Sequence, residues 1–330
     1  MHFLAASDRY SQMSYRRCGY SGVQLPAVSL GLWHNFGTVD SYDNSKKIIF
    51  KAFDKGINHF DLANNYGPPP GSAETTFGKI LKDDLQRYRD ELVISTKAGY
   101  LMWPGPFGEW GSRKYLLASL DQSLQRMNLD YVDIFYSHRF DPDTPLEETM
   151  GALAHAVKSG KALYAGISNY SPEQTIEAIR ILRSLNTPCL IHQVRFSLMQ
   201  PEARNELSTV LSNEGVGCIA FSPLGQGILT DRYLNGIPED SRAGKKHGFL
   251  KKEQVNTEII DKVRKLKTLS ASLGISIAEL SLNWVKSHNF VTSVLIGASS
   301  VEQLEQNLGI VSNDDFDEDT MESIRQIMKY

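Results

Sequence analysis

Four residues of this chain have side chains that together could reduce a carbonyl group: Asp61, Tyr66, Lys97 and His138. A phenol with a pKa near 10 is a poor proton donor at neutral pH unless a neighbouring cation stabilises its anion. Lys97 would be that cation, and Asp61 would hold it charged and oriented. His138 would donate a hydrogen bond to the carbonyl oxygen, so that the polarised carbonyl could accept a hydride.

Each residue also has an ordinary structural interpretation. Asp61 could cap a turn and Tyr66 could pack on a loop, whereas Lys97 could be solvated and His138 could be a hydrogen-bonded core histidine. Lys97 has a second chemical interpretation, as the Schiff-base lysine of a barrel lyase. The four residues therefore need a fold that brings them together.

The elements that would position them are short β-branched or aromatic segments, each followed by a segment with helical periodicity. The eight predicted strands are Ala27–Trp33, His59–Ala63, Leu92–Lys97, Tyr131–His138, Ala162–Ser168, Cys189–Phe196, Gly217–Pro223 and Val291–Gly297. The predicted helices include Tyr115–Met127, Leu146–Lys158, Pro172–Leu185 and Ile277–Ser287.

Eight consecutive strand–helix units with right-handed crossovers close most simply into an α/β (β/α)8 TIM barrel, although an open doubly wound sheet would show the same pattern. A hairpin over Tyr15–Leu25 is expected before the barrel, a long loop with an extra helix near Thr257–Leu273 after the seventh strand, and a terminal helix over Asp317–Met328. We expect residues 1–330 to form one barrel domain. In such a barrel the functional residues follow the carboxyl ends of the strands, where all four residues lie.

The composition excludes several classes of partner. The 35 Lys and Arg against 38 Asp and Glu give a net charge of −3, which disfavours binding to nucleic acid or an anionic membrane. The three cysteines are scattered, which indicates neither disulfides nor a thiolate metal site, and no metal is expected. The chain lacks P-loop, GxSxG, HExxH and Rossmann GxGxxG motifs. The N-terminal segment has no apolar core long enough for a signal peptide, so a cytoplasmic location is expected.

Motifs spread over nearly the whole chain resemble the aldo-keto reductase family: GINHFDLANNYG, STKAG, VDIFYSHR, GISNYS, IHQ, AFSPLGQGIL and VLIGASSVEQLEQN. LGLWHNFG, NNYGPPPGSAE, GSRKYL and YLNGIPEDSRA are similar to the branch that contains bacterial L-glyceraldehyde 3-phosphate reductases and potassium-channel β subunits. The channel subunits resemble the chain less, because they tend to carry Asn at the position of His138. A regulatory, redox-sensing NADPH-binding subunit with little turnover is therefore an alternative that intact Tyr66 and His138 argue against.

The resemblance implies that Asp61, Tyr66, Lys97 and His138 are catalytic, with Tyr66 as proton donor, and that the cofactor is NADP(H). Ser168, Asn169 and Gln193 would bind the carboxamide and Phe221 would stack on the nicotinamide. Ser222, Leu224, Gly225, Gln226 and Gly227 would surround the pyrophosphate, and Gly297, Ser299, Gln303 and Asn307 the adenosine phosphate. Trp33 and Asp61 are also expected to contact cofactor. Gln306 departs from the acidic residue common at the adenine.

The residues expected to contact substrate are Trp33, Trp103, Trp110 and Arg139. Arg139 could receive a phosphate or another acidic group. Arg242, supported by Arg232, is predicted to bind the 2′-phosphate that distinguishes NADPH from NADH, although Asp231, Glu239 and Asp240 could pair with these arginines. The expected activity is reduction of small polar carbonyl compounds such as L-glyceraldehyde 3-phosphate and methylglyoxal. Family resemblance also suggests a homo-oligomer, a tetramer or an octamer.

Overall fold

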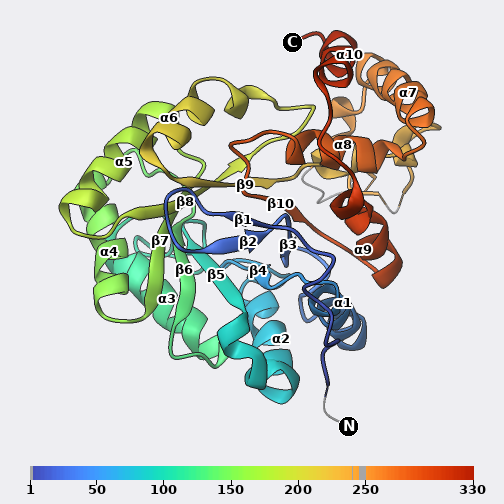
Figure 1. Ribbon diagram of the computed structural model, residues 1–330. Coiled ribbons are helices and arrows are strands. Elements are labelled where there is room, and N and C mark those ends of the chain that lie inside the picture. The colour runs from blue at the N-terminus through green and yellow to red at the C-terminus, as the bar shows by residue number, and fades with distance from the viewer. Residues whose placement is uncertain (1–2, 240, 245–249) are drawn as a thin grey trace.

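Eight parallel strands close into a barrel in the computed structural model, which describes residues 3–239, 241–244 and 250–330. The order around the barrel is β10-β3-β4-β5-β6-β7-β8-β9, so each strand pairs with its neighbour in sequence and the last pairs with the first. Figure 1 shows the strands enclosed by helices. The strands are β3 (Val28–Gly31), β4 (His59–Asp61), β5 (Val93–Ala98), β6 (Val132–Ser137), β7 (Ala162–Ser168), β8 (Cys189–Arg195), β9 (Gly217–Phe221) and β10 (Ser293–Ile296).

The predicted (β/α)8 barrel is therefore confirmed, and the open sheet is not formed. Each predicted strand coincides with an observed one, and most observed strands are shorter by a few residues. The exception at a boundary is β5, which ends at Ala98, one residue beyond the predicted end at Lys97. The strands read as nearly continuous apolar runs because helices cover one face and the barrel interior the other. In β6, for example, every residue is buried.

Ten α-helices cover the barrel within the described part of the chain. They are α1 (Tyr42–Asp54), α2 (Ser72–Ile80), α3 (Arg113–Met127), α4 (Leu146–Lys158), α5 (Pro172–Ser184), α6 (Glu206–Glu214), α7 (Thr257–Ser272), α8 (Ile277–Lys286), α9 (Val301–Leu308) and α10 (Glu318–Met328). Serine side chains accept hydrogen bonds from the first turns of α3, α5 and α8, and Ser171 and Ser276 form complete capping boxes. A π-helical turn, η1 (Leu81–Leu85), extends α2. The short 3₁₀ turns are η2 (Gln86–Glu91), η3 (Glu202–Arg204), η4 (Gly225–Gly227), η5 (Asp231–Tyr233), η6 (Lys252–Gln254) and η7 (Gly309–Ser312).

The predicted hairpin is formed by β1 (Tyr15–Arg17) and β2 (Gln24–Pro26). It crosses the barrel in Figure 1 and contacts the segment that precedes β9, because the amide of Tyr20 donates to the carbonyl of Gly215. Gly19 has φ +55°, and a Cβ there would lie 1.9 Å from that carbonyl oxygen, so only glycine fits. Cys18, Cys189 and Cys218 are all free and buried, which agrees with a role in packing.

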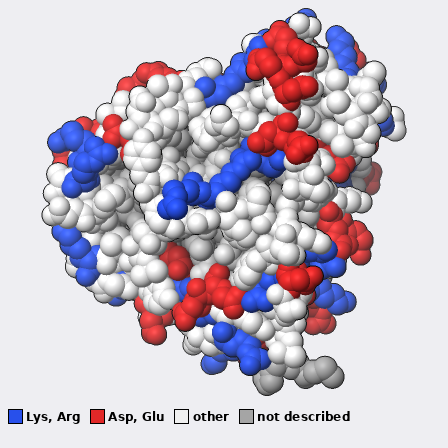
Figure 2. All heavy atoms as spheres, in the orientation of Figure 1, with Lys and Arg blue, Asp and Glu red and all other residues white. Residues whose placement is uncertain are grey.

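The accessory helices α7 and α10 also form where they are expected. Acidic and basic side chains both occur at several places on the face seen in Figure 2. Within the described ranges, no helix has the length and apolarity needed to cross a membrane, and no group of three or more His, Cys, Asp or Glu side chains could hold a metal ion.

Candidate active site

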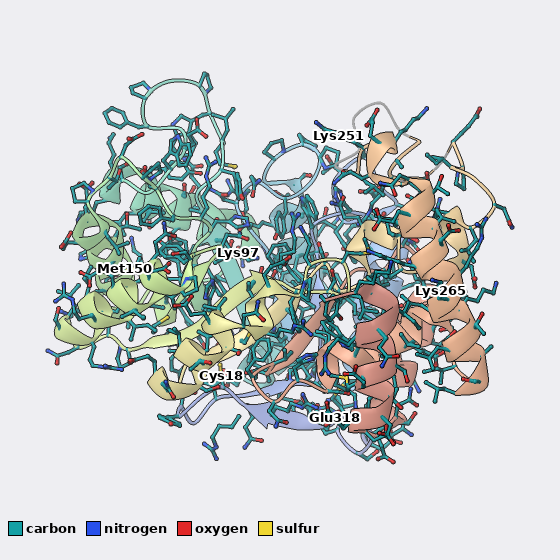
Figure 3. The ribbon with its side chains drawn as sticks, turned by 90° about the horizontal axis from the view of Figure 1, so that it is seen from above. Cys18, Lys97, Met150, Lys251, Lys265 and Glu318 are labelled. Carbon is teal, nitrogen blue, oxygen red and sulfur yellow. The ribbon has the colours of Figure 1, made fainter. Side chains whose placement is uncertain are left out.

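The ammonium of Lys97 is the centre of a buried polar cluster inside the barrel (Figure 3). Neighbouring strands β4 and β5 supply Asp61 and Lys97, and the loop after β4 supplies Tyr66. Lys97 Nζ donates to Asp61 Oδ2 and to the carbonyl oxygen of Leu62, both at 2.6 Å, and to the Tyr66 hydroxyl at 3.3 Å. An ammonium has three hydrogens, so these three acceptors use all of them.

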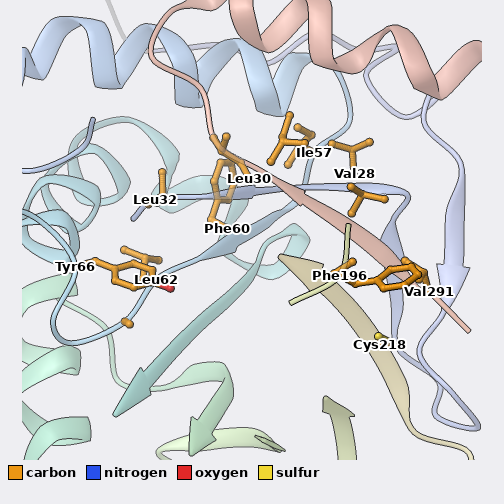
Figure 4. Close-up of a cluster of buried hydrophobic side chains, with 14 of the residues drawn as sticks. Val28, Leu30, Leu32, Ile57, Phe60, Leu62, Tyr66, Phe196, Cys218 and Val291 are labelled. Carbon is orange, nitrogen blue, oxygen red and sulfur yellow. The ribbon is translucent and has the colours of Figure 1, made fainter. Parts of the chain in front are cut away.

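This arrangement leaves the phenolic proton of Tyr66 available for another acceptor. The Tyr66 oxygen accepts from Lys97, so its own O–H is not needed for that contact. Burial raises the pKa of Tyr66 well above 10, with the Asp61 charge adding to this, so the side chain is a neutral phenol at physiological pH. Tyr66 packs beside Leu62 near the core side chains shown in Figure 4.

Lys97 and Asp61 form an ion pair with no exposed side-chain surface. Burial lowers the pKa of Lys97, and the carboxylate of Asp61 opposes this shift by favouring the charged amine. A Schiff-base lyase requires an unprotonated, reachable amine. Because the nitrogen is enclosed and all its hydrogens have acceptors, the structure gives the lyase alternative no support.

His138 follows β6 and faces the same cluster. Its ring lies 5.9 Å from the ring of Tyr66 and 4.7 Å from that of Tyr100, centroid to centroid. Burial, together with the charges of Lys97 and Arg139, lowers the pKa of His138 well below 6.5, so the imidazole is neutral at physiological pH. A neutral imidazole can donate one hydrogen bond to a carbonyl oxygen without delivering a full proton.

Asp61 has two further donors. Ser95 Oγ donates to Asp61 Oδ1 at 2.7 Å, and Gln193 Nε2 donates to the same oxygen at 3.0 Å. Gln193, which the resemblance predicts to be a cofactor residue, is thus hydrogen-bonded to the carboxylate of the ion pair. Sequence reasoning missed Ser95. The signal was available, because Ser95 lies two positions before Lys97 and side chains two apart point to the same face of a strand.

The predicted carboxamide residues lie together at the ends of β7 and β8. Asn169 Nδ2 donates to the carbonyl oxygen of His138 and to Ser168 Oγ, both at 3.1 Å, and the Asn169 amide donates to the carbonyl of Gln193 at 3.2 Å. Asn169 has φ +60°, a conformation that costs free energy for a residue other than glycine and that clusters at functional sites.

The segment after β9 has an unusual backbone. Ser222, Gly225, Gln226 and Gly227 all have φ between +54° and +98°. Leu224 precedes this turn, and Phe221 ends β9 with the guanidinium of Arg195 5.5 Å from its ring centroid. Within this turn the backbone amides of Gly225 and Gly227 donate to the carbonyls of Ser222 and Leu224 at 2.9 and 3.0 Å. Glycine has no Cβ, so a bound group could approach the backbone closely here. The Oε1 atom of Gln226 is buried and has no hydrogen-bond partner among the described residues.

The start of α9 lies after β10, next to this turn in the barrel order. A Cβ built on Gly297 would meet no atom within 4 Å, so there is open space beside this glycine. Ser299 donates to Gln303 through both its amide and its hydroxyl, and Asn307 Nδ2 donates to the carbonyl of Gly297 at 3.4 Å. Gln306 is exposed.

Arg232 and Arg242 are exposed at the residue level. Desolvation lowers the pKa of the Arg242 guanidinium, Tyr233 opposes this shift, and the nearby charge of Arg232 adds to it. Asp231 pairs with Lys267 at 2.7 Å. Of the other two acids that could pair with the arginines, Glu239 is exposed and Asp240 lies outside the described residues. Two like charges held close together disfavour each other unless an anion binds between them.

Three tryptophans and Arg139 lie in the loops after β3, β5 and β6. The ring of Trp33 is 6.3 Å from that of Tyr66, whereas Trp103 packs 5.2 Å from Tyr115. Arg139 lies over Trp110 at 3.5 Å, donates through Nε to the carbonyl of Gly99 and pairs with Glu109 at 2.8 Å. Trp110 has φ +74°, which is rare for a bulky residue. Through these contacts Arg139 holds the loop after β5 next to His138.

Comparisons with known proteins agree with this geometry. Residues 27–329 match the model of the aldo/keto reductase family. The chain is 57% identical to L-glyceraldehyde 3-phosphate reductase of Escherichia coli strain K12 over 317 residues, which cover 95% of this chain and 92% of that protein. It is 56% identical to the reductase of the same name from Escherichia coli O157:H7 over 330 residues, covering 99% and 95%. The chain therefore belongs to the aldo/keto reductase family and is an oxidoreductase that acts on carbonyl groups with a nicotinamide cofactor.

Proposed function

We propose that this enzyme uses NADPH to reduce small polar aldehydes and ketones to alcohols, with L-glyceraldehyde 3-phosphate and methylglyoxal-like compounds as substrates. The observation that carries the proposal is the hydrogen-bond set of Lys97, which accounts for all three ammonium hydrogens and leaves the Tyr66 proton for a substrate oxygen. The similarity to the two Escherichia coli reductases supports the choice of a triose phosphate.

In the proposed reaction, His138 orients the substrate carbonyl oxygen and Tyr66 gives it a proton. The hydride for the carbonyl carbon would come from the dihydronicotinamide of NADPH when this cofactor is bound. The O–H bond of Tyr66 breaks and a new O–H bond forms on the product alcohol, leaving a phenolate. Lys97 already donates to this oxygen and stabilises the negative charge that develops there, and a proton from solvent then restores the phenol.

The residues around the barrel mouth fit such a cofactor. Gln193 and Asn169 offer amide groups for a carboxamide, and Phe221 offers a ring for stacking. The turn through Gly225, Gln226 and Gly227 would lie along a pyrophosphate, because its two glycines let the backbone approach the phosphates closely. The open space beside Gly297 and the start of α9 fit the adenosine phosphate, with Ser299, Gln303 and Asn307 at hand.

The preference for NADPH over NADH would depend on Arg242 with Arg232 in support. A 2′-phosphate placed between these neighbouring guanidinium groups would relieve their mutual repulsion and accept charge-assisted hydrogen bonds. Arg139 would play a similar part for a substrate phosphate, since it lies directly after His138. A phosphate bound there would have to replace Glu109 as the ion-pair partner of Arg139. Trp33, Trp103 and Trp110 would line the substrate side.

A panel of small aldehydes and ketones, assayed with purified protein as loss of reduced-cofactor absorbance, tests the activity. Turnover with L-glyceraldehyde 3-phosphate and methylglyoxal, and faster turnover with NADPH than with NADH, is the expected result. No turnover with any small carbonyl compound would favour the alternative function, a redox-sensing regulatory subunit that binds NADPH. We further propose that the chain forms one barrel domain and is cytoplasmic. We also propose that it assembles into a tetramer or octamer, and light scattering of the purified protein would test this assembly.

A further inference from the structure

A chain of hydrogen bonds runs from Asp61 through the interior of the barrel, away from the candidate substrate site. Ser95 Oγ donates to Asp61 Oδ1 at 2.7 Å, and His59 Nε2 lies 3.1 Å from Ser95 Oγ. His59 Nδ1 lies 2.8 Å from Ser29 Oγ, which in turn lies 2.6 Å from Ser293 Oγ. All five side chains are buried, and they come from the adjacent strands β4, β5, β3 and β10.

The direction of donation in this chain follows from counting hydrogens. A carboxylate only accepts, so the single hydroxyl hydrogen of Ser95 goes to Asp61. His59 Nε2 must then donate to Ser95, and in a neutral imidazole Nδ1 must accept. Ser29 therefore donates to His59, and Ser293 donates to Ser29. Every donor points toward the carboxylate.

His59 is neutral over the working pH range. Burial lowers the pKa of His59 to about 4, and the charge of Lys97 acts in the same direction while Asp61 opposes it. A uniformly directed set of neutral hydrogen bonds polarises along its length, so each bond strengthens the next. Its last member, Ser95, is one of two neutral donors to Asp61 Oδ1, the other being Gln193.

We propose that Ser95 and His59 are positioning residues that fix the Asp61 carboxylate toward Lys97 and so set the proton affinity of Tyr66. This inference rests on the proposed reductase function. The hydrogen-bond chain cannot itself deliver a proton, because moving each proton one place toward Asp61 would leave an alkoxide on Ser293. Its role is therefore to orient and polarise the carboxylate.

The expected consequence concerns alcohol oxidation, in which Tyr66 acts as the base. Loss of Ser95 would leave Gln193 as the one neutral donor to Asp61 Oδ1 among the described residues, so the carboxylate would be held less firmly. Its contact with Lys97 would weaken, and the ammonium would give less support to the phenolate. The pH at which the oxidation rate rises would therefore move upward. Titratable and charged groups surround the Asp61–Lys97 pair and Tyr66. They are His59 of β4, Glu74 of α2, Tyr136 of β6, His138 and Arg139 directly after β6, and Tyr100 in the loop after β5.

The test measures alcohol oxidation with NADP⁺ against pH for Ser95→Ala, His59→Leu and His59→Gln. We expect Ser95→Ala to lower kcat about 10-fold or more, because small misplacements of catalytic groups are costly, and to move the rise of the profile upward by about one pH unit. His59→Leu should shift the profile in the same direction. His59→Gln should recover much of the loss, since an amide can donate to Ser95 and accept from Ser29.

Ser281→Ala is the matched control, because Ser281 is a buried serine of α8 whose hydroxyl has no partner among the described residues. It should leave the pH profile unchanged. A second readout needs no turnover: nitrogen-15 NMR should show His59 as the neutral tautomer with the proton on Nε2, with the signal assigned by its loss in His59→Gln.

Three outcomes would overturn the proposal. These are a proton on Nδ1 of His59, equal losses in His59→Leu and His59→Gln, or a kcat loss in Ser95→Ala with the same pH profile as Ser281→Ala. If Ser95→Ala does not fold, the two His59 variants and the tautomer still decide. A wild-type protein without turnover would instead refute the proposed reductase function, and the NMR readout would separately test the hydrogen-bond chain.

Discussion

Replacing Tyr66 by Phe is the most direct test of the mechanism. The substitution removes one oxygen atom from a side chain that is otherwise buried, so it leaves the packing of the ring on Leu62 and Trp33 intact. It deletes the proposed proton donor and leaves one hydrogen of the Lys97 ammonium without its 3.3 Å acceptor.

The magnitude follows from these two losses. General acid catalysis contributes roughly 10²- to 10⁴-fold in rate, so kcat for carbonyl reduction should fall by at least about 100-fold. The unsatisfied ammonium hydrogen should cost about 1 to 3 kcal/mol of unfolding free energy. Affinity for NADPH should change little, because most of the proposed cofactor contacts follow β7, β8, β9 and β10 and the substitution leaves Asp61 and Trp33 in place.

The assay combines single-turnover reduction of methylglyoxal, NADPH titration by fluorescence and chemical denaturation. Tyr136→Phe is the matched control, since Tyr136 pairs with Lys97 across β5 and β6, is fully buried and has a hydroxyl without a partner among the described residues. Its removal should leave kcat unchanged and stability equal or slightly higher. Retained turnover in Tyr66→Phe, or an equal loss in both variants, would refute Tyr66 as the donor.

Arg242→Ala should weaken NADPH binding by roughly 10- to 100-fold, the equivalent of about 1.5 to 3 kcal/mol for a charge-assisted contact, and leave NADH binding unchanged. Calorimetric titration of both cofactors measures this, and equal losses for the two would contradict a phosphate contact. Gly166→Ala should destabilise the barrel by about 1 to 3 kcal/mol in urea unfolding, because its Cβ would lie 2.6 Å from the Tyr136 ring; an unchanged midpoint would contradict that packing. Burial favours a higher pKa for Asp141, but its hydrogen bonds, including those from Thr144 and the amide of Gly111, together outweigh burial and lower the pKa from its ordinary value. A carboxyl whose pKa is lower in the folded state than in the unfolded state stabilises the protein at pH values above the unfolded-state pKa, and this stabilisation is lost as the pH falls through the folded-state pKa. The free energy of unfolding should therefore depend less on pH on the acid side in Asp141→Asn. An unchanged slope in that range would show that Asp141 does not contribute to it.

The sequence alone was sufficient to predict the order of strands and helices, because each strand is a short apolar run and each helix carries its own periodicity and cap. Ser171 and Ser276, for instance, cap their helices through contacts three residues away. It also placed Asp61, Tyr66, Lys97 and His138 at the ends of their strands, since a strand end is a local property of the chain. Parallel strands then bring such ends to one rim.

Only the tertiary structure decided which atoms meet. The three acceptors of Lys97, the contact of Gln193 with Asp61 across 132 positions, and the pairing of Arg139 with Glu109 depend on barrel closure and on register between strands. The chain Asp61–Ser95–His59–Ser29–Ser293 likewise joins strands that are far apart in sequence, and no local pattern specifies it. Hydrogen bonding acts over about 3 Å and depends on direction, so it is determined by the positions of atoms in the closed barrel rather than by the order of residues.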